Sequence, residues 1–260
     1  MYIIARMRGW AARAAVIGLA VAAACSNPLG RQYEYEEQLY LGVDGAATIV
    51  VDASFAALVA LRGVTIDTSP TARIDRAEIR RLFEAAGCPV QNVGQPWRRK
   101  GRRFIQVRLA ADDVQTLSAC GLLSWSSYEL KRVDEQLQYR QVVGPPTVRD
   151  PGAVNWDGSE IVAFKLHLPS RVHFHNVRRL EDGSTGSLER GNILTWEQRL
   201  ADRRAGQPVE MEVRMDPTSI LNTTLWLFGG AFAAAVATLV LIIWWTMRRG
   251  RQKWKVKNKK

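Results

Sequence analysis

The most concentrated chemistry in the sequence is a run of cationic side chains that follows a tryptophan. Trp97 is followed by five cations within six residues: Arg98, Arg99, Lys100, Arg102 and Arg103. Each cation near a bilayer surface adds about 1 kcal/mol to the attraction of anionic lipids, and an anionic envelope glycan would attract the same charges. We therefore predict that Trp97–Arg103 is a loop that binds anionic headgroups. The alternative is a solvated loop whose charge is balanced by acids elsewhere in the domain.

The three histidines are the next candidates, because three imidazoles form the protein ligand set of some zinc sites. His173 and His175 would share one face of a strand, and His167 lies across a turn at Pro169. A metal-dependent hydrolase would need the three rings to converge within about 4 Å of one point. No Cys, Asp or Glu stands at ligand spacing beside them, so we predict neither a metal site nor a cofactor.

The sequence lacks the common catalytic motifs. It contains no Gly-x-Ser-x-Gly elbow, no Ser-x-x-Lys, no His-Glu-x-x-His and no Gly-rich phosphate loop. The paired carboxylates Asp112 and Asp113 are neighbours in sequence and therefore do not face one another; they suit the start of a helix. We interpret the chain as non-catalytic.

The elements that position these residues indicate an α+β domain over residues 25–145. A hairpin is expected over residues 31–54, with its turn at Val43-Asp44-Gly45. Ser54 and Asp75 are typical N-caps of two short helices. The fold predicted for the chain is an antiparallel sheet with two or three short helices packed on one face, followed by a β-rich segment and one C-terminal transmembrane helix.

The second part of the exported region has a different composition. Residues 146–158 are rich in Gly and Pro and are expected to be a linker. Residues 159–217 contain strand-like segments separated by turns, and they are too few to bury a core alone. We expect this β-rich segment to pack on the first domain.

Several aromatic residues fall on predicted strands. One concave sheet face lined by them could hold an acyl chain or a glycolipid; the alternative is that they form the core. They are Tyr33, Tyr35, Trp125, Tyr128 and Tyr139.

Residues 1–24 have the features of a bacterial lipoprotein signal peptide. Three arginines and no acid precede an uncharged stretch, residues 14–24, which is too short to cross a hydrocarbon core of ~30 Å. Small residues then lead directly to Cys25, as at a site where the thiol receives a diacylglycerol. We predict lipidation of Cys25. The alternatives are ordinary cleavage after Ala24 and an uncleaved anchor.

Residues 225–247 are predicted to form a transmembrane helix, because none of them is charged and tryptophans lie near both ends. Residues 248–260 hold eight Lys or Arg and no acid, which predicts a cytoplasmic tail. The main domain then lies outside the cytoplasm, at the bacterial inner membrane. Residues 25–224 carry 25 basic and 25 acidic side chains, so the net charge of +11 comes from the two ends and indicates no nucleic-acid partner.

The two remaining cysteines, Cys88 and Cys120, are an even number in a compartment that permits disulfides. A bridge between them would close a 33-residue loop and stabilise the domain by about 3–4 kcal/mol. The alternative is two separate buried thiols. We predict the bridge.

This layout resembles the LppM-like family of bacterial membrane-anchored lipoproteins. The shared features are the lipobox Cys25, the hairpin with its Gly turn, the Leu168-Pro169-Ser170-Arg171-Val172 turn, and the strand with Gly191, Asn192 and Trp196 before one C-terminal helix and a basic tail. The resemblance spans most of the chain. It implies a non-enzymatic envelope protein that binds a lipid or glycolipid at the membrane surface.

Two main functions remain open at this point, and a metal-dependent hydrolase that uses the three histidines is a minor third alternative. A lipid or glycolipid binder predicts an apolar cavity between the sheet and the helices. A protein-interaction module of an envelope complex predicts a filled core and an exposed apolar or basic patch.

Overall fold

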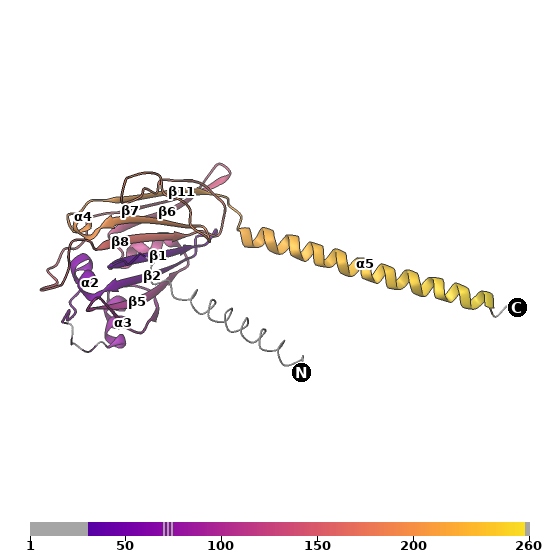
Figure 1. The fold of residues 1–260 in the computed structure, drawn as a ribbon, viewed down its shortest axis with the longest axis horizontal. Helices are drawn as coiled ribbons and strands as arrows, with labels where there is room; N and C mark the ends of the chain where they lie inside the picture. Colours follow the sequence, from indigo (N-terminus) through magenta and orange to yellow (C-terminus); the bar gives the residue numbers. More distant parts are fainter. Residues whose placement is uncertain (1–30, 70, 72, 74, 258–260) are drawn as a thin grey trace, which may run out of the picture. The chain divides into compact units, whose positions relative to one another are not determined.

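The computed structural model describes residues 31–69, 71, 73 and 75–257. Residues 1–33 form one unit and residues 34–260 another. The predicted signal peptide, residues 1–24, and the predicted lipidation site, Cys25, lie outside the described residues. The second unit contains two β-sheets stacked on one another (Figure 1).

The larger sheet has seven strands in the order β10-β8-β1-β2-β5-β3, with β4 also paired to β5. Its strands are β1 (Tyr35–Leu41), β2 (Ala47–Ser54), β3 (Val90–Val93), β4 (Trp97–Arg99), β5 (Arg102–Ala111), β8 (Ile161–His167) and β10 (Ile193–Arg199). The pair β1 and β8 is parallel, and the other pairs of this sheet are antiparallel.

The smaller sheet has the order β6-β7-β11-β9. Its strands are β6 (Ser126–Val133), β7 (Gln136–Val143), β9 (Val172–His175) and β11 (Val209–Met215). The β-rich segment, residues 159–217, therefore supplies strands to both sheets. The residues expected to form a linker, 146–158, connect β7 of the smaller sheet to β8 of the larger one.

The helices are α2 (Phe55–Arg62), α3 (Arg76–Ala85), the 3₁₀ helix η1 (Val114–Ala119), α4 (Leu200–Arg204) and α5 (Ile220–Lys257). Ser54 Oγ accepts a hydrogen bond from Ala57 N at the start of α2, and Gly63 ends that helix with a φ of 66°. The carboxylate of Asp75 caps α3 in the same way. These caps are the reason that both helices could be predicted, whereas α4, which has no side-chain cap, was not predicted.

The two faces of the larger sheet differ in burial, as the alternating side chains of β1 show. Tyr35, Leu39 and Leu41 are buried, whereas Glu36, Gln38 and Tyr40 point to the other side. The smaller sheet and α3 cover the inner face in one shared core, which includes Ile79 and Phe83 of α3. The predicted α+β class, with its short helices on one face of a mostly antiparallel sheet, is confirmed.

Of the aromatic residues expected on a concave face, Tyr35, Tyr128 and Tyr139 lie in this core and Trp125 packs against it. Tyr33 precedes β1 and is not part of the core. Tyr35 and Tyr139 are fully buried and Tyr128 nearly so. The Tyr35 and Trp125 rings meet edge to face, with centroids 5.7 Å apart. These rings fill the space between the sheets instead of lining an open groove.

Cys88 and Cys120 form the predicted disulfide, with their Cα atoms 4.5 Å apart. The bridge joins the chain after α3 to the end of η1, and both residues are buried. It therefore ties together two of the short elements that cover the larger sheet.

The chain enters α5 at one end of the larger sheet. Ile220 N donates to Pro169 O at 2.9 Å, and Ser170 Oγ donates to Thr218 O at 2.9 Å, so the turn after β8 holds the start of α5. The β4–β5 hairpin lies at the other end, because Phe104 pairs with Ser54 of β2. The ten residues of β5 separate the two ends by roughly 30 Å. Within α5, residues 224–248 are long and apolar enough to cross a membrane, and an 18-residue stretch of them has a mean hydropathy of 2.3.

Candidate functional site

The segment predicted as a basic loop is a β-hairpin. Lys100 and Gly101 form its two-residue turn, with φ values of 49° and 74°. Positive φ at both positions is the pattern of a type I′ turn, which matches the twist of the flanking strands. Trp97 stacks on Phe104 with ring centroids 5.7 Å apart, and the Arg99 guanidinium lies 4.2 Å from the Phe104 centroid. Burial lowers the pKa of Arg99.

Arg102 and Arg103 attach this hairpin to the domain. Arg102 Nε lies 3.1 Å from Glu34 Oε2, and Arg102 Nη1 lies 3.3 Å from Glu160 Oε1. Arg103 is buried and donates from Nη2 to Asp67 O at 2.6 Å; its burial lowers the pKa of the guanidinium. Among the six predicted binding residues, Arg102 and Arg103 attach the hairpin to the domain, and Arg99 packs on Phe104. The other three, Trp97, Arg98 and Lys100, are exposed.

A cavity of 130 Å³, the hairpin cleft, lies beside the turn of this hairpin. Lys100, Arg102 and Arg103 line one side, the first two residues of α2 line another, and residues 153–155 close it. Its lining residues include no acid, and the N-terminal end of α2 adds a partial positive charge. Arg102 is already paired with Glu34 and Glu160, and Arg103 donates to Asp67 O, so Lys100 is the lining cation that suits one small anionic group. The cleft is too small for an acyl chain, since ligand pockets measure ~300–1,000 Å³.

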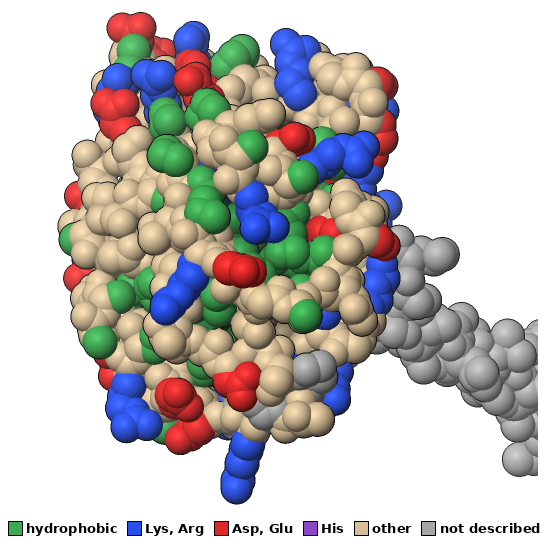
Figure 2. Space-filling model, turned by 90° about the vertical axis from the view of Figure 1, so that its left-hand side faces the viewer, with side chains coloured by type: hydrophobic (Ala, Val, Ile, Leu, Met, Phe, Trp, Pro, Cys, Tyr) green, Lys and Arg blue, Asp and Glu red, His purple; other side chains and the backbone are tan. Residues whose placement is uncertain are grey.

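The surface around this end of the domain is mixed in charge. Figure 2 shows the end that carries α2 and α4, and basic, acidic and hydrophobic side chains are interspersed across it. The positive charge of the hairpin cleft is therefore local and does not belong to an extended basic face.

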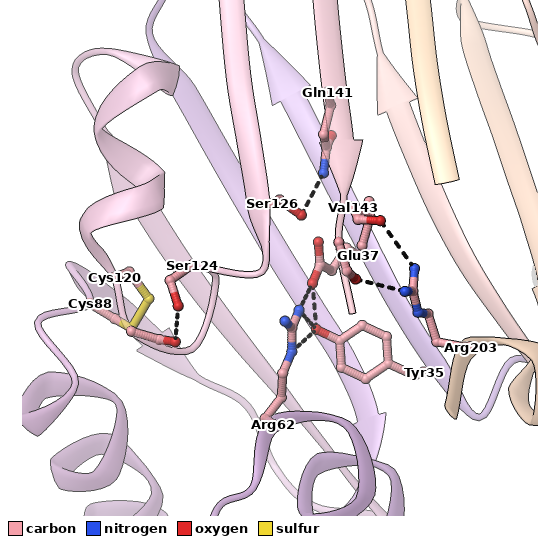
Figure 3. Close-up of polar contacts among 12 residues, drawn as sticks. Tyr35, Glu37, Arg62, Cys88, Cys120, Ser124, Ser126, Gln141, Val143 and Arg203 are labelled. Carbon is pink, nitrogen blue, oxygen red and sulfur yellow. Dashed lines mark hydrogen bonds and ion pairs between the residues drawn. A yellow bond between two sulfur atoms is a disulfide. The ribbon is translucent and has the colours of Figure 1, made fainter. Parts of the chain in front are cut away.

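A buried polar cluster between the two sheets is a second feature of the fold (Figure 3). Arg62, the last residue of α2, forms an ion pair with Glu37 of β1, and both side chains are almost fully buried. Tyr35 donates its hydroxyl hydrogen to Glu37, and Arg62 Nε donates to the Tyr35 oxygen at 2.9 Å. The cluster fixes the end of α2 against the inner face of the sheet.

A second arginine lies in the same region, and it forms no ion pair with any carboxylate that the structure describes. Arg203 of α4 is fully buried and donates to Val143 O at 3.4 Å and Gly144 O at 2.6 Å. The guanidinium carbons of Arg62 and Arg203 lie 3.2 Å and 5.2 Å from the centroid of the Trp125 ring. Burial, and next the repulsion by Arg62, lower the pKa of Arg203 to about 10.

Three buried atoms of this cluster have no hydrogen-bond partner in the described part of the chain: Glu37 Oε2, Trp125 Nε1 and Arg203 Nε. The cluster is therefore only partly satisfied, which reduces its contribution to stability. Sequence reasoning missed it, although a signal was present. Glu37 is two residues from Tyr35 and from Leu39, so its side chain points to the same buried face of β1. A charge at such an inward position requires a partner.

The three histidines do not converge. His167 lies on β8 of the larger sheet and stacks on Tyr40, whereas His173 and His175 lie on β9 of the smaller sheet. His173 Nε2 is 2.5 Å from Asp216 Oδ1. Within the residues that the structure describes, no group of three His, Cys, Asp or Glu side chains could hold a metal ion. The arrangement that the hydrolase hypothesis requires is not found there.

No family model and no curated protein sequence matches this chain. Among solved structures, the folded domain of LppM from Mycobacterium tuberculosis, determined by NMR, is similar to it at a TM-score of 0.38 and 13% sequence identity, covering 75% of this chain and 96% of that one. The comparisons thus assign the chain to no family, and the LppM-like resemblance stays a prediction.

Proposed function

We propose that this chain is a non-catalytic lipoprotein of a bacterial inner membrane whose extracytoplasmic domain binds the anionic headgroup of a lipid or glycolipid. The hairpin cleft is the binding site, and the observation that carries the proposal is the cation-lined cavity beside Lys100. The apolar helix within α5 supports the membrane location. The basic tail, residues 248–260, supports a cytoplasmic C-terminus.

The predicted lipid anchor supports the choice of site. The two ends of the sheet are roughly 30 Å apart, and α5 starts at the end that does not carry the hairpin. Cys25 precedes Glu34 by nine residues, a tether that can extend at most about 32 Å. Because Glu34 contacts Arg102, a lipid on Cys25 would keep the hairpin end within about 32 Å of the bilayer.

The described interior favours binding of the headgroup over binding of an acyl chain. The aromatic residues between the sheets pack against one another, and α2 is buried along its whole length. The hairpin cleft is small and lined by cations. We therefore assign to this site a phosphate or carboxylate that remains part of a lipid in the bilayer.

A protein-interaction module of an envelope complex is the second candidate function. It is favoured by the exposed Trp97, which is 37% accessible and lies next to Arg98. Tryptophan and arginine are enriched at interface centres. In this case the partner would contact the outside of the hairpin and would not need the cleft.

The test uses the full chain in nanodiscs of phosphatidylethanolamine and phosphatidylglycerol. Native mass spectrometry after release from the nanodiscs counts the phosphatidylglycerol molecules that remain bound. Replacing both Arg98 and Lys100 by glutamine is expected to remove at least one of them. Both side chains are exposed, so the domain should keep its fold.

Lys131→Gln with Arg132→Gln is the matched control, because it removes two exposed cations from the β6–β7 hairpin. This variant should retain the wild-type number of lipids, since the basic tail is the same in all three proteins. Equal retention in the Arg98/Lys100 variant and the wild type would exclude the hairpin cleft as a headgroup site and favour the protein-interaction function.

A further inference from the structure

The outer face of the seven-stranded sheet carries a separate hollow of 520 Å³. It lies where β1 and β5 end and β2 begins, which is the end of the sheet at which α5 starts. Small side chains, including Ala47 and Ala110, leave the space open, and Tyr40 forms one wall. The volume is within the ~300–1,000 Å³ typical of small-ligand sites.

Tyr40 is held rigidly beside this hollow. Its ring stacks on His167, with centroids 4.0 Å apart and an angle of 17° between the planes. Its hydroxyl donates to Gln38 Oε1 at 3.2 Å, and Gln38 Nε2 donates to Asp52 at 3.3 Å. Tyr40 is nevertheless 41% exposed. One face of the ring is thus fixed by His167, and the ring remains accessible to a ligand from the hollow.

The polar groups around the hollow are hydrogen-bond acceptors and hydroxyls. Asp112 is exposed, and its carboxylate makes no hydrogen bond or ion pair with any residue that the structure describes. Thr48 and Thr116 also line the hollow, and no Lys, Arg or His does. A carboxylate can accept hydrogen bonds from two neighbouring hydroxyls at once.

These features select one class of ligand. An anion is disfavoured, because the lining has a carboxylate and no cation. An acyl chain is disfavoured, because three polar side chains surround an open hollow. A sugar ring fits both features, since its apolar C–H face stacks on an aromatic ring and its hydroxyls donate to a carboxylate. We propose that this hollow binds one sugar unit, stacked on Tyr40 and hydrogen-bonded to Asp112.

Two sources could present such a sugar. It could be the headgroup of a glycolipid in the bilayer near the start of α5, or part of a soluble glycan. If the source is a membrane glycolipid, the proposal rests on the proposed function; if the source is a soluble glycan, it does not. It does not depend on the hairpin cleft, which lies at the opposite end of the sheet.

The test again uses the full chain in nanodiscs, with saturation-transfer difference NMR of added maltose, cellobiose and chitobiose. The wild type is expected to transfer saturation to the ring protons of at least one disaccharide. Tyr40→Leu should weaken its binding roughly two- to tenfold, because the stacking partner is lost. Asp112→Asn should also weaken it, since the amide replaces one acceptor oxygen by a donor.

Phe174→Leu is the control, because it replaces another exposed aromatic residue, on β9 of the smaller sheet. It should leave binding unchanged, as should the glutamine variant of Arg98 and Lys100. A parallel sample with monoglucosyl-diacylglycerol in the nanodiscs separates the two sources. Native mass spectrometry should show Tyr40-dependent retention of this lipid if the source is a membrane glycolipid. Absence of both signals in the wild type, or signals unchanged by Tyr40→Leu, would overturn the proposal.

Discussion

Arg102 Nε lies 3.1 Å from Glu34 Oε2, so the basic hairpin is joined to the residue immediately before β1. The same guanidinium lies 3.3 Å from Glu160 Oε1, just before β8. Glu34 and Glu160 are 2% and 8% exposed. One cation thus holds together three segments that are far apart in sequence, and the position of the hairpin cleft depends on it.

Replacing Arg102 by glutamine is expected to destabilise the domain. Two buried carboxylates would lose their cation, although Glu34 would keep a bond from Trp156 Nε1 and Glu160 would keep bonds from two backbone amides. We expect a loss of about 3 kcal/mol, or roughly 6–12 °C in the thermal midpoint, measured by tryptophan fluorescence of the full chain in detergent. The neighbouring Arg98→Gln should change the midpoint little, because Arg98 is exposed. Equal midpoints for the two variants would contradict this role of Arg102.

The buried pair of Glu37 and Arg62 should show strong coupling. Glu37→Leu alone or Arg62→Met alone leaves one buried charge without its partner and is expected to cost about 3–5 kcal/mol. The double variant Glu37→Leu with Arg62→Met should cost clearly less than the sum, because no charge is left behind. A double-mutant cycle on thermal unfolding measures the difference. The exposed pair of Glu129 and Lys131 should show coupling below about 1 kcal/mol, and additive effects at both pairs would refute the prediction.

The sequence was sufficient to predict the elements that depend on local signals. Ser54 and Asp75 mark the starts of α2 and α3 by capping chemistry, and both have the expected roles. Alternation along β1 and the turn residues after it identify the first hairpin. The predicted pairing of Cys88 with Cys120 followed from their even number and from the compartment.

The parts that sequence reasoning missed depend on contacts between distant segments. The parallel pairing of β1 with β8 has no local signal, because the two strands are far apart in sequence. The sequence alone could not distinguish Arg102 and Arg103, which have structural roles, from the neighbouring cations. The partners of these two arginines, Glu34, Glu160 and Asp67, lie in other segments. The hollow beside Tyr40 exists because small residues from neighbouring strands meet there.

The disulfide should contribute strongly to stability and resist reduction in the folded state. Cys88→Ser with Cys120→Ser is expected to cost about 3–4 kcal/mol, because the unfolded chain gains the freedom of an open 33-residue loop. In the wild type both residues are almost fully buried, so a thiol reagent with mild reductant should label them only after unfolding. Mass spectrometry of the labelled peptides measures this. Rapid labelling of the folded chain would show that the bridge is accessible.

Lipidation of Cys25 remains a prediction that can be tested directly. If Cys25 is the mature N-terminus, mass spectrometry of the N-terminal peptide should show a diacylglycerol-modified cysteine. Cys25→Ala should lack this modification and retain the signal peptide. The protein should stay in the membrane fraction, since the apolar helix in α5 is unchanged. An unmodified Cys25 in the wild type would exclude the lipoprotein assignment.

The outer face of the sheet should give the domain a pH-dependent stability through Asp52. Burial raises the pKa of this carboxyl from 3.8 to about 6, opposed by a hydrogen bond from Gln106 and reinforced by Glu36. The folded chain therefore holds this proton to higher pH than the unfolded chain. The resulting stability is fully present below about pH 4 and is lost as the pH rises through about 6.

Asp52→Asn should remove this part of the pH dependence. The shift corresponds to about 3 kcal/mol at most, and partial exposure of Asp52 reduces the expected effect to about 1–2 kcal/mol. As the pH is raised from about 5 to about 7, the thermal midpoint should fall less in the variant than in the wild type. Asp182→Asn is the control, because hydrogen bonds from Ser184 lower the pKa of that exposed carboxyl and its contribution changes only in more acidic solution. Parallel profiles for Asp52→Asn and the wild type would mean that Asp52 is ionised in the folded domain throughout this range, and that its hydrogen bonds from Gln38 and Gln106 outweigh its burial.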